Sequence, residues 1–207
     1  MKRYLVFGAA VLTAAVSISA ANAAKDDFNR DQLGPKWKVV AGSLFIQNDA
    51  LQGSGGALGY FKPSKAAVSA SVTANPTGPF AAVALGDIAH LNNIYVQVGN
   101  AAGQWGFGSF AEGNNSNGTT FQMKALLAGP IRITVSMCGT VATLAIKSTL
   151  GGKAQKYTFD YGKTFPTGAG LGMSSNTALD DYQSKTAGCK TDPTATVIRR
   201  ASQSKGN

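Results

Sequence analysis

Residues able to do chemistry are few in this chain. Glu112 is the only glutamate and His90 the only histidine. Hydrolysis of a glycosidic bond uses two carboxyl groups about 5 to 9 Å apart, but Asp87 and Asp160 each stand alone at the end of an apolar run, where an aspartate usually belongs to a turn. One histidine and two distant cysteines are too few for a zinc site. We therefore predict no catalytic residue, and the sequence favours a protein that is not an enzyme.

Aromatic residues between positions 95 and 110 offer a different chemistry. An exposed aromatic ring can stack on the C–H groups of a sugar, while neighbouring amide side chains bind its hydroxyls. The candidate carbohydrate contacts are Tyr95, Gln97, Trp105 and Phe107. Burial is the competing explanation, because large aromatic side chains also dominate hydrophobic cores.

Alternation along a strand separates these candidates. Successive side chains of a strand point to opposite faces of the sheet. The aliphatic residues of segment 94–98 alternate with Tyr95 and Gln97, so an aliphatic core side places Tyr95 and Gln97 outside. Trp105 and Phe107 share a face, and the pattern leaves open whether that face is the core.

The first 23 residues have the form of a cleaved signal peptide. Lys2 and Arg3 precede an apolar stretch over 4–18, and the small residues Ala21 and Ala23 form a cleavage site. No later stretch is long and apolar enough to predict a transmembrane segment. We therefore expect an exported protein, located in the periplasm or outside the cell.

Export bears on the two cysteines. Two cysteines in an oxidising compartment usually pair, so we predict a disulfide between Cys138 and Cys189. Cys138 stands in an expected hairpin turn, and the bond would hold the segment that follows the last strand.

Charge and composition bear on the partners. Charged residues make up 14% of the chain, well below the usual quarter or so. Once Lys2 and Arg3 leave with the signal peptide, 17 basic residues stand against 10 acidic ones, a net charge of +7. A positive charge favours acidic partners such as anionic polysaccharides. The basic residues are scattered along the chain, and we expect no nucleic-acid binding.

Short segments with a period of two fill residues 24–189, and helical periodicity is absent. Gly, Pro and Asn turns separate these segments, which include 93–99, 104–110, 121–126, 131–137 and 141–148. The polar run 112–118 is predicted to be a turn. This pattern predicts an all-β domain with two antiparallel sheets. Residues 190–207 are polar and basic, and we expect a disordered tail.

The motif order near the start of this domain resembles a known family. It contains D-x-F-N-R from Asp26, L-G-x-x-W from Leu33, and G-x-x-x-I-x-N-x-x-L-x-G from Gly42. This order resembles the N-terminal part of concanavalin A-like lectin/glucanase (laminin-G-like) jelly-roll domains of bacterial secreted proteins, and the segments around Gly170 and Leu179 resemble their closing strands. The resemblance implies a two-sheet antiparallel jelly-roll sandwich whose terminal strands lie side by side.

The same resemblance implies a cofactor. Such jelly rolls often carry a calcium ion near the paired terminal strands, and aspartates supply the oxygen ligands that calcium prefers. Aspartates stand at 26–27 and 180–181, with Asp27 and Asp180 as the first candidates. A basic neighbour such as Arg30 could neutralise these carboxylates instead. We expect no other cofactor.

Three functions stay open. The first is an exported lectin-like domain that binds a polysaccharide or other glycan without cutting it, and it predicts exposed aromatic rings on a concave sheet face. The second is an extracellular structural or adhesive protein without a specific sugar ligand, and it predicts a featureless face. The third is a glycan-processing hydrolase, and it predicts a pair of carboxylates in a cleft.

Overall fold

A computed structural model describes residues 23–75, 78–99, 104–111, 114–122, 128–187 and 196–198. Within these residues the regular structure is β-strand, apart from one 3-10 turn, η1, over Lys62–Ser64. This part of the chain contains no helix of the length and apolarity that a membrane span requires. The predicted signal peptide lies outside the described residues except for Ala23.

The described residues form fourteen strands. Their bounds are β1 Ala23–Asp26, β2 Trp37–Gln47, β3 Ala50–Phe61, β4 Ser69–Asn75, β5 Ala81–Asp87, β6 Asn92–Gly99, β7 Gln104–Ala111, β8 Asn114–Gln122, β9 Ile131–Cys138, β10 Val141–Ser148, β11 Gln155–Asp160, β12 Ala169–Met173, β13 Ala178–Lys185 and β14 Thr196–Ile198.

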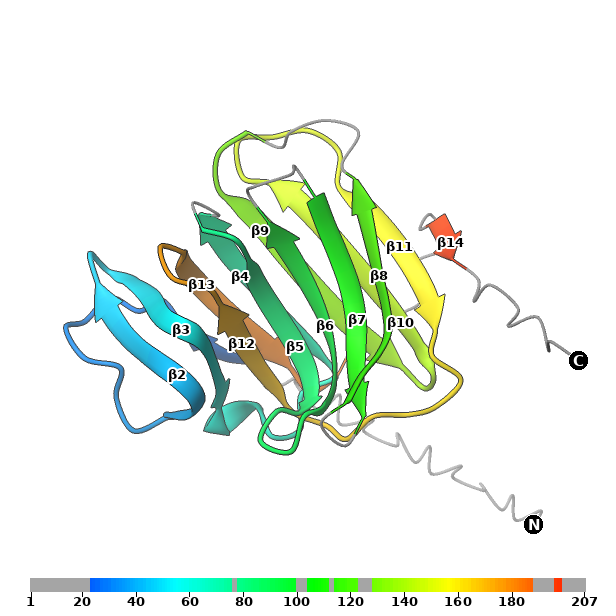
Figure 1. The fold of residues 1–207 in the computed structure, drawn as a ribbon, viewed down its shortest axis with the longest axis horizontal. Helices are drawn as coiled ribbons and strands as arrows, with labels where there is room; N and C mark the ends of the chain where they lie inside the picture. Colours follow the sequence, from blue (N-terminus) through cyan, green and yellow to red (C-terminus); the bar gives the residue numbers. More distant parts are fainter. Residues whose placement is uncertain are drawn as a thin grey trace, which may run out of the picture.

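These strands form one curled sheet whose two halves pack face to face (Figure 1). The front sheet runs β2-β3-β12-β5-β6-β7-β8, and the back sheet runs β1-β13-β4-β9-β10-β11-β14. Strand β3 joins them, because Leu51 pairs with β13 while Leu58 pairs with β12. All pairings are antiparallel except β11 with β14. The predicted all-β, two-sheet antiparallel sandwich is therefore confirmed.

The core lies between the two sheets and follows the period-two alternation of the strands. Trp105 and Phe107 of β7 meet back-sheet rings there: Trp105 lies 5.1 Å from Tyr157 and Phe107 lies 5.2 Å from Phe159, centroid to centroid. The indole Nε1 of Trp105 donates a hydrogen bond to Gln155 Oε1 at 3.1 Å. The packed rings and the satisfied indole explain why these large side chains lie inside.

The terminal strands lie side by side, as the resemblance implied. Strand β1 pairs with β13, with Asp26 opposite Tyr182. The Asp26 carboxylate accepts hydrogen bonds from Arg30 at 2.5 and 2.8 Å and from Trp37 Nε1 at 2.7 Å. These bonds hold the pKa of Asp26 below its ordinary value although burial opposes them. The D-x-F-N-R and L-G-x-x-W motifs thus close the sandwich around one buried carboxylate.

Two elements differ from the sequence prediction. Strand β8 begins at Asn114, inside the run predicted to be a turn, because pairing with β7 overrides the low strand propensity of Asn and Gly. Strand β14, over Thr196–Ile198, pairs with β11 inside the predicted disordered tail. The other residues of the predicted tail lie outside the described residues.

Candidate functional site

The structure places the four predicted sugar contacts on opposite sides of the front sheet. Trp105 and Phe107 are 1% and 2% exposed and belong to the core. Their assignment as carbohydrate contacts is therefore wrong, because a ligand on the protein surface does not reach them. Tyr95 and Gln97 are half-buried and lie on the outer face, which confirms the direction predicted from alternation.

Tyr95 belongs to a row of residues that crosses the front sheet in register. Along this row, Tyr60 of β3 faces Gly170 of β12, which faces Ala84 of β5, which faces Tyr95 of β6. Neighbouring strands lie about 4.8 Å apart, so three strand spacings separate the two tyrosines by about 14 Å. This is the separation of the two backbones, and it is longer than one sugar ring.

Small residues lie between the two tyrosines. Ala82 and Ala84 are 7% and 4% exposed although they sit on the outer side of β5. A Cβ atom added to Gly172 would point outward and meet Leu58 Cδ1 at 3.6 Å and Ala82 Cβ at 3.9 Å. The larger side chains of β3 and β6 therefore flank a buried floor of glycine and alanine. Ile88, from the turn after β5, packs over Gly170, where an added Cβ would meet Ile88 Cγ1 at 3.0 Å. We call this surface the tyrosine face; it comprises Leu58, Tyr60, Ala82, Ala84, Tyr95, Gln97, Gly170 and Gly172.

Tyr95 is held in place on this face by another ring. The centroid of Phe110 on β7 lies 5.3 Å from that of Tyr95, with 34° between the ring planes. Phe110 lies diagonally across the strand pair, since Tyr95 is directly opposite Gly108. A positioned ring loses less conformational freedom on binding a ligand than a mobile one.

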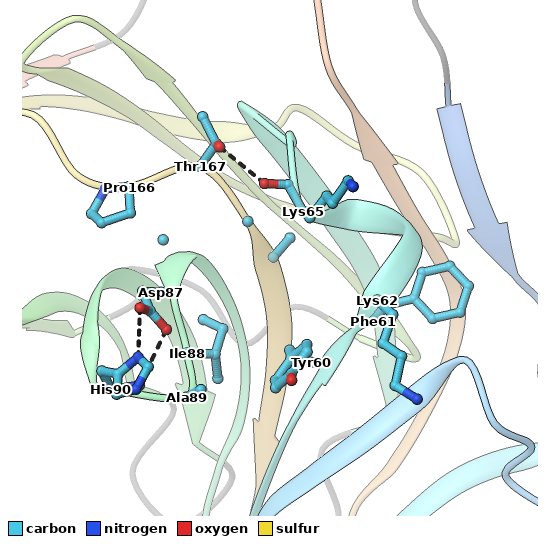
Figure 2. Close-up of a pocket in the computed structure, with 13 residues that line it drawn as sticks. Tyr60, Phe61, Lys62, Lys65, Asp87, Ile88, Ala89, His90, Pro166 and Thr167 are labelled. Atoms are coloured by element: carbon cyan, nitrogen blue, oxygen red, sulfur yellow. Dashed lines mark hydrogen bonds and ion pairs between the residues drawn. The ribbon is translucent and has the colours of Figure 1, made fainter.

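A cleft of about 300 Å³ opens at one end of the tyrosine face. Tyr60 belongs to the face and also lines the cleft. We call it the end cleft (Figure 2). Its walls come from the end of β3 with η1, the turn after β5, and the loop before β12. Thr167 joins two of these walls by donating a hydrogen bond from Oγ1 to the Lys65 carbonyl at 2.9 Å.

The turn after β5 brings the single histidine to this cleft. His90 Nδ1 lies 2.7 Å from Asp87 Oδ2, and the His90 backbone N–H donates to Asp87 Oδ1 at 3.2 Å. The hydrogen bond from the imidazole lowers the pKa of Asp87. With Nδ1 turned toward the carboxylate, His90 Nε2 is the nitrogen available to a ligand, and the His90 side chain is 81% exposed.

The predicted calcium ligands lie near one another but do not form a ligand set. The Asp26 carboxylate is hydrogen-bonded to Arg30 and Trp37. A basic neighbour thus neutralises this carboxylate, which was the alternative to calcium. Burial, together with the charges of Asp181 and Asp27, raises the pKa of Asp180. Within the described ranges, no group of three or more His, Cys, Asp or Glu side chains could hold a metal ion. Calcium at Asp27 and Asp180 stays a prediction without a fitting side-chain site.

The predicted disulfide is described at one end only. Cys138 is the last residue of β9, where its side chain follows Thr134 and Ser136 on the outer side of the back sheet. Cys189 lies outside the described residues. The pairing of Cys138 with Cys189 stays a prediction.

Tyr60 is the residue that sequence reasoning missed. The alternation of segment 57–61 predicted a strand. Nothing in the sequence indicated that only one strand, β12, separates it from β5 in the sheet. The signal available was the cluster of small residues in 168–172, which predicts a strand with a bare outer side between larger neighbours.

Comparisons with known proteins agree with this architecture. No family model matches the sequence, and no curated protein matches it. Among solved structures, the carbohydrate-binding module CBM66 from Bacillus subtilis is similar with a TM-score of 0.53 and 13% identity, over 72% of this chain and 91% of that chain. The winged bean acidic lectin complexed with methyl-α-D-galactose is similar with a TM-score of 0.57 and 8% identity, over 80% and 98%.

The chain has the concanavalin A-like jelly-roll fold. An apo Crh5 transglycosylase shares it, with a TM-score of 0.56 and 14% identity, over 80% of this chain and 85% of that chain. Binding proteins and an enzyme therefore share the architecture. Identities this low show the fold alone, so function has to be argued from the tyrosine face and the end cleft.

Proposed function

We propose that this protein is an exported, lectin-like domain that binds a glycan on the tyrosine face without cutting it. The observation that carries the proposal is the row in which Tyr60 and Tyr95 stand about 14 Å apart across a floor of glycine and alanine. Flat rings suit the C–H faces of sugars, and Ala82 and Gly172 add no bulk to the outer side of the sheet next to the Ile88 side chain that packs over Gly170.

Hydrogen bonding on this face supports the same ligand. Gln97 lies opposite Ala82 and two residues from Tyr95, so its amide can both donate to and accept from sugar hydroxyls beside the ring. An open sheet face buries little of each sugar, and affinities between millimolar and micromolar are expected, or about 4 to 8 kcal/mol.

The test is a screen of the protein on a glycan array, followed by affinity electrophoresis on the polysaccharides it retains. Tyr60→Ala and Tyr95→Ala should each weaken retention by about ten-fold, because stacking a sugar on either ring buries apolar surface worth about 1.5 kcal/mol. Phe45→Ala is the matched control, since Phe45 is 40% exposed and lies near the hairpin end of β2, opposite Gln52. If no glycan binds, or if Phe45→Ala weakens binding as much as the tyrosine variants, the proposal fails and a structural or adhesive role takes its place.

Glycan processing is the second candidate, and one observation favours it. Asp87 orients the His90 ring in a cleft that adjoins the tyrosine face, and a histidine held in this way can act as a general base. New chain ends released from a bound polysaccharide over long incubation, and lost in His90→Gln, would support catalysis. Unchanged polymer length after incubation with the wild-type protein would contradict catalysis, and binding would be the remaining function.

A further inference from the structure

Lysines from separate elements lie near Tyr60 in the sheet and in the end cleft. Lys38 of β2 is directly opposite Tyr60 of β3 in the strand register. Lys62 and Lys65 lie in and just after η1 and line the end cleft beside Tyr60. Figure 2 shows Tyr60 and Lys62 across the cleft from the Asp87–His90 pair.

The strand pairing makes Lys38 and Tyr60 point to the same side. Trp37 and Phe61, which are also directly opposite each other, are 5% and 2% exposed and face the core. Because directions alternate along both strands, the neighbouring pair of Lys38 and Tyr60 points outward. The pairing continues past the end of β3, since the Lys62 N–H donates to the Lys36 carbonyl at 2.8 Å.

Within the part of the chain that the structure describes, no acidic side chain forms an ion pair with Lys38, Lys62 or Lys65. The ion pairs found among the described residues join Arg30 to Asp26 and His90 to Asp87, and neither includes one of these lysines. Lys62 Nζ donates to the Pro35 carbonyl at 2.8 Å, and a neutral carbonyl leaves the ammonium charge in place. Asp87 is the acidic side chain of the end cleft, and His90 occupies its carboxylate.

We propose that the tyrosine face selects acidic glycans, with Lys38, Lys62 and Lys65 contacting an anionic group on the sugar that stacks on Tyr60. The proposal rests on the proposed function and adds the ligand class. Ammonium groups on flexible stems bind an anion as point charges without demanding a fixed geometry, so both a carboxylate and a sulfate on the sugar fit this chemistry.

The test uses pairs of polymers that differ in charge but share a backbone. Polygalacturonate is compared with its methyl-esterified form for the carboxylate, and dextran sulfate with dextran for the sulfate. At low salt we expect the wild-type protein to bind one or both charged members about ten-fold more tightly than the neutral partner. The difference should shrink as salt rises, because exposed charges are screened beyond about 10 Å at 0.1 M.

Charge variants locate the effect. Lys38→Gln, Lys62→Gln and Lys65→Gln should each weaken binding of the charged polymer about two- to five-fold, the size of an exposed ion pair, and leave the neutral polymer unchanged. Lys153→Gln is the matched control. Lys153 is exposed in the loop between β10 and β11, so this substitution removes the same charge at a different place on the surface.

The outcomes separate this proposal from the one on which it rests. Equal binding of charged and neutral polymers that is lost in Tyr60→Ala overturns charge selection and keeps the glycan site. Binding of no glycan in these pairs or on the array overturns both. If Lys153→Gln weakens binding as much as Lys38→Gln, and double-stranded DNA is bound as tightly as the charged glycan, the effect is ion exchange by the whole basic protein and the proposal is wrong.

Discussion

The outer faces of the two sheets are built from different side chains. The tyrosine face of the front sheet carries two rings and an amide around glycine and alanine. The outer side of the back sheet carries hydroxyls, which come from Ser69, Ser71, Thr73, Thr134, Ser136 and Thr143. No aromatic ring lies among the described outward residues of β4, β9 and β10.

Two of these hydroxyls, on Ser71 and Thr73, form hydrogen bonds within the protein. The Arg132 guanidinium donates to Ser71 Oγ at 2.6 Å, to Thr73 Oγ1 at 3.1 Å and to the Asp181 carbonyl at 2.6 Å. These bonds tie β9 to β4 and β13. Both sheets share the same core pattern, so the difference lies in the outer faces, and it agrees with the proposed binding on the front sheet and with cohesion on the back.

Removal of a ring should lower stability by different amounts on the two sides of the front sheet. Trp105→Ala removes a buried indole and its bond to Gln155, and should lower the free energy of unfolding by about 3 to 5 kcal/mol. Tyr95→Ala should lower it by about 1 kcal/mol, because Tyr95 is only half-buried. Urea unfolding measures both; equal losses would mean that Tyr95 is a core residue.

The predicted disulfide would join the chain after β13 to the end of β9 in the back sheet. Closing a loop of about 50 residues between Cys138 and Cys189 stabilises the fold by about 4 kcal/mol in the chain-entropy model. Reduction should therefore lower the unfolding midpoint while glycan affinity on the front sheet stays the same. Alkylation of both thiols in the native, unreduced protein would contradict the pairing.

Alkaline titration tests the inner side of the back sheet. Burial raises the pKa of Tyr182 to about 12, while its hydroxyl donates to Ser64 Oγ at 3.0 Å. Tyrosinate forms in the unfolded chain near pH 10, so stability present below pH 10 is lost as pH rises to about 12, by about 2 to 3 kcal/mol. Tyr182→Phe should show a shallower loss over this range, and an equally steep loss would contradict the assignment.

The strands were predictable because alternation and turn residues are local signals. Segment 141–148 coincides with β10, and 131–137 differs from β9 by one residue. Strand β8 was missed because its Asn and Gly residues have low strand propensity and its pairing with β7 is a tertiary effect.

The candidate site was predictable only where aliphatic residues showed which face of the strand points into the core. The valines of β6 placed Tyr95 and Gln97 outside, whereas the residues that alternate with Trp105 and Phe107 include Gly106, Gly108 and Phe110, which do not identify a core side. The row from Tyr60 to Tyr95 joins strands far apart in the sequence, so its existence depends on strand order.

The smallest expected effect lies on the outer side of the back sheet. Burial and the nearby charges of Asp181 and Asp27 raise the pKa of Asp180, so its ionisation opposes folding as pH rises through that pKa. Asp180→Asn keeps the oxygen that accepts from the Asp181 N–H at 2.7 Å, and should stabilise the protein at pH 7 by a few tenths of a kcal/mol, or about 1 °C in Tm. A lower Tm in this variant, together with a fall in the wild-type Tm on adding EGTA, would instead indicate calcium at Asp27 and Asp180.

The most direct measurement compares the two outer faces by filling each of them. A Cβ at Gly172 makes only ordinary contacts, so Gly172→Gln places an amide side chain on the floor of the tyrosine face without a backbone clash, and Gly172→Ala is its smaller counterpart. Thr143→Gln adds bulk to the back face on β10. With a glycan selected on the array, calorimetry should show affinity near wild type for Gly172→Ala and Thr143→Gln, and a loss of about ten-fold or more for Gly172→Gln. Wild-type affinity in a folded Gly172→Gln, with a loss in Thr143→Gln, would contradict the account and move the binding surface to the back sheet.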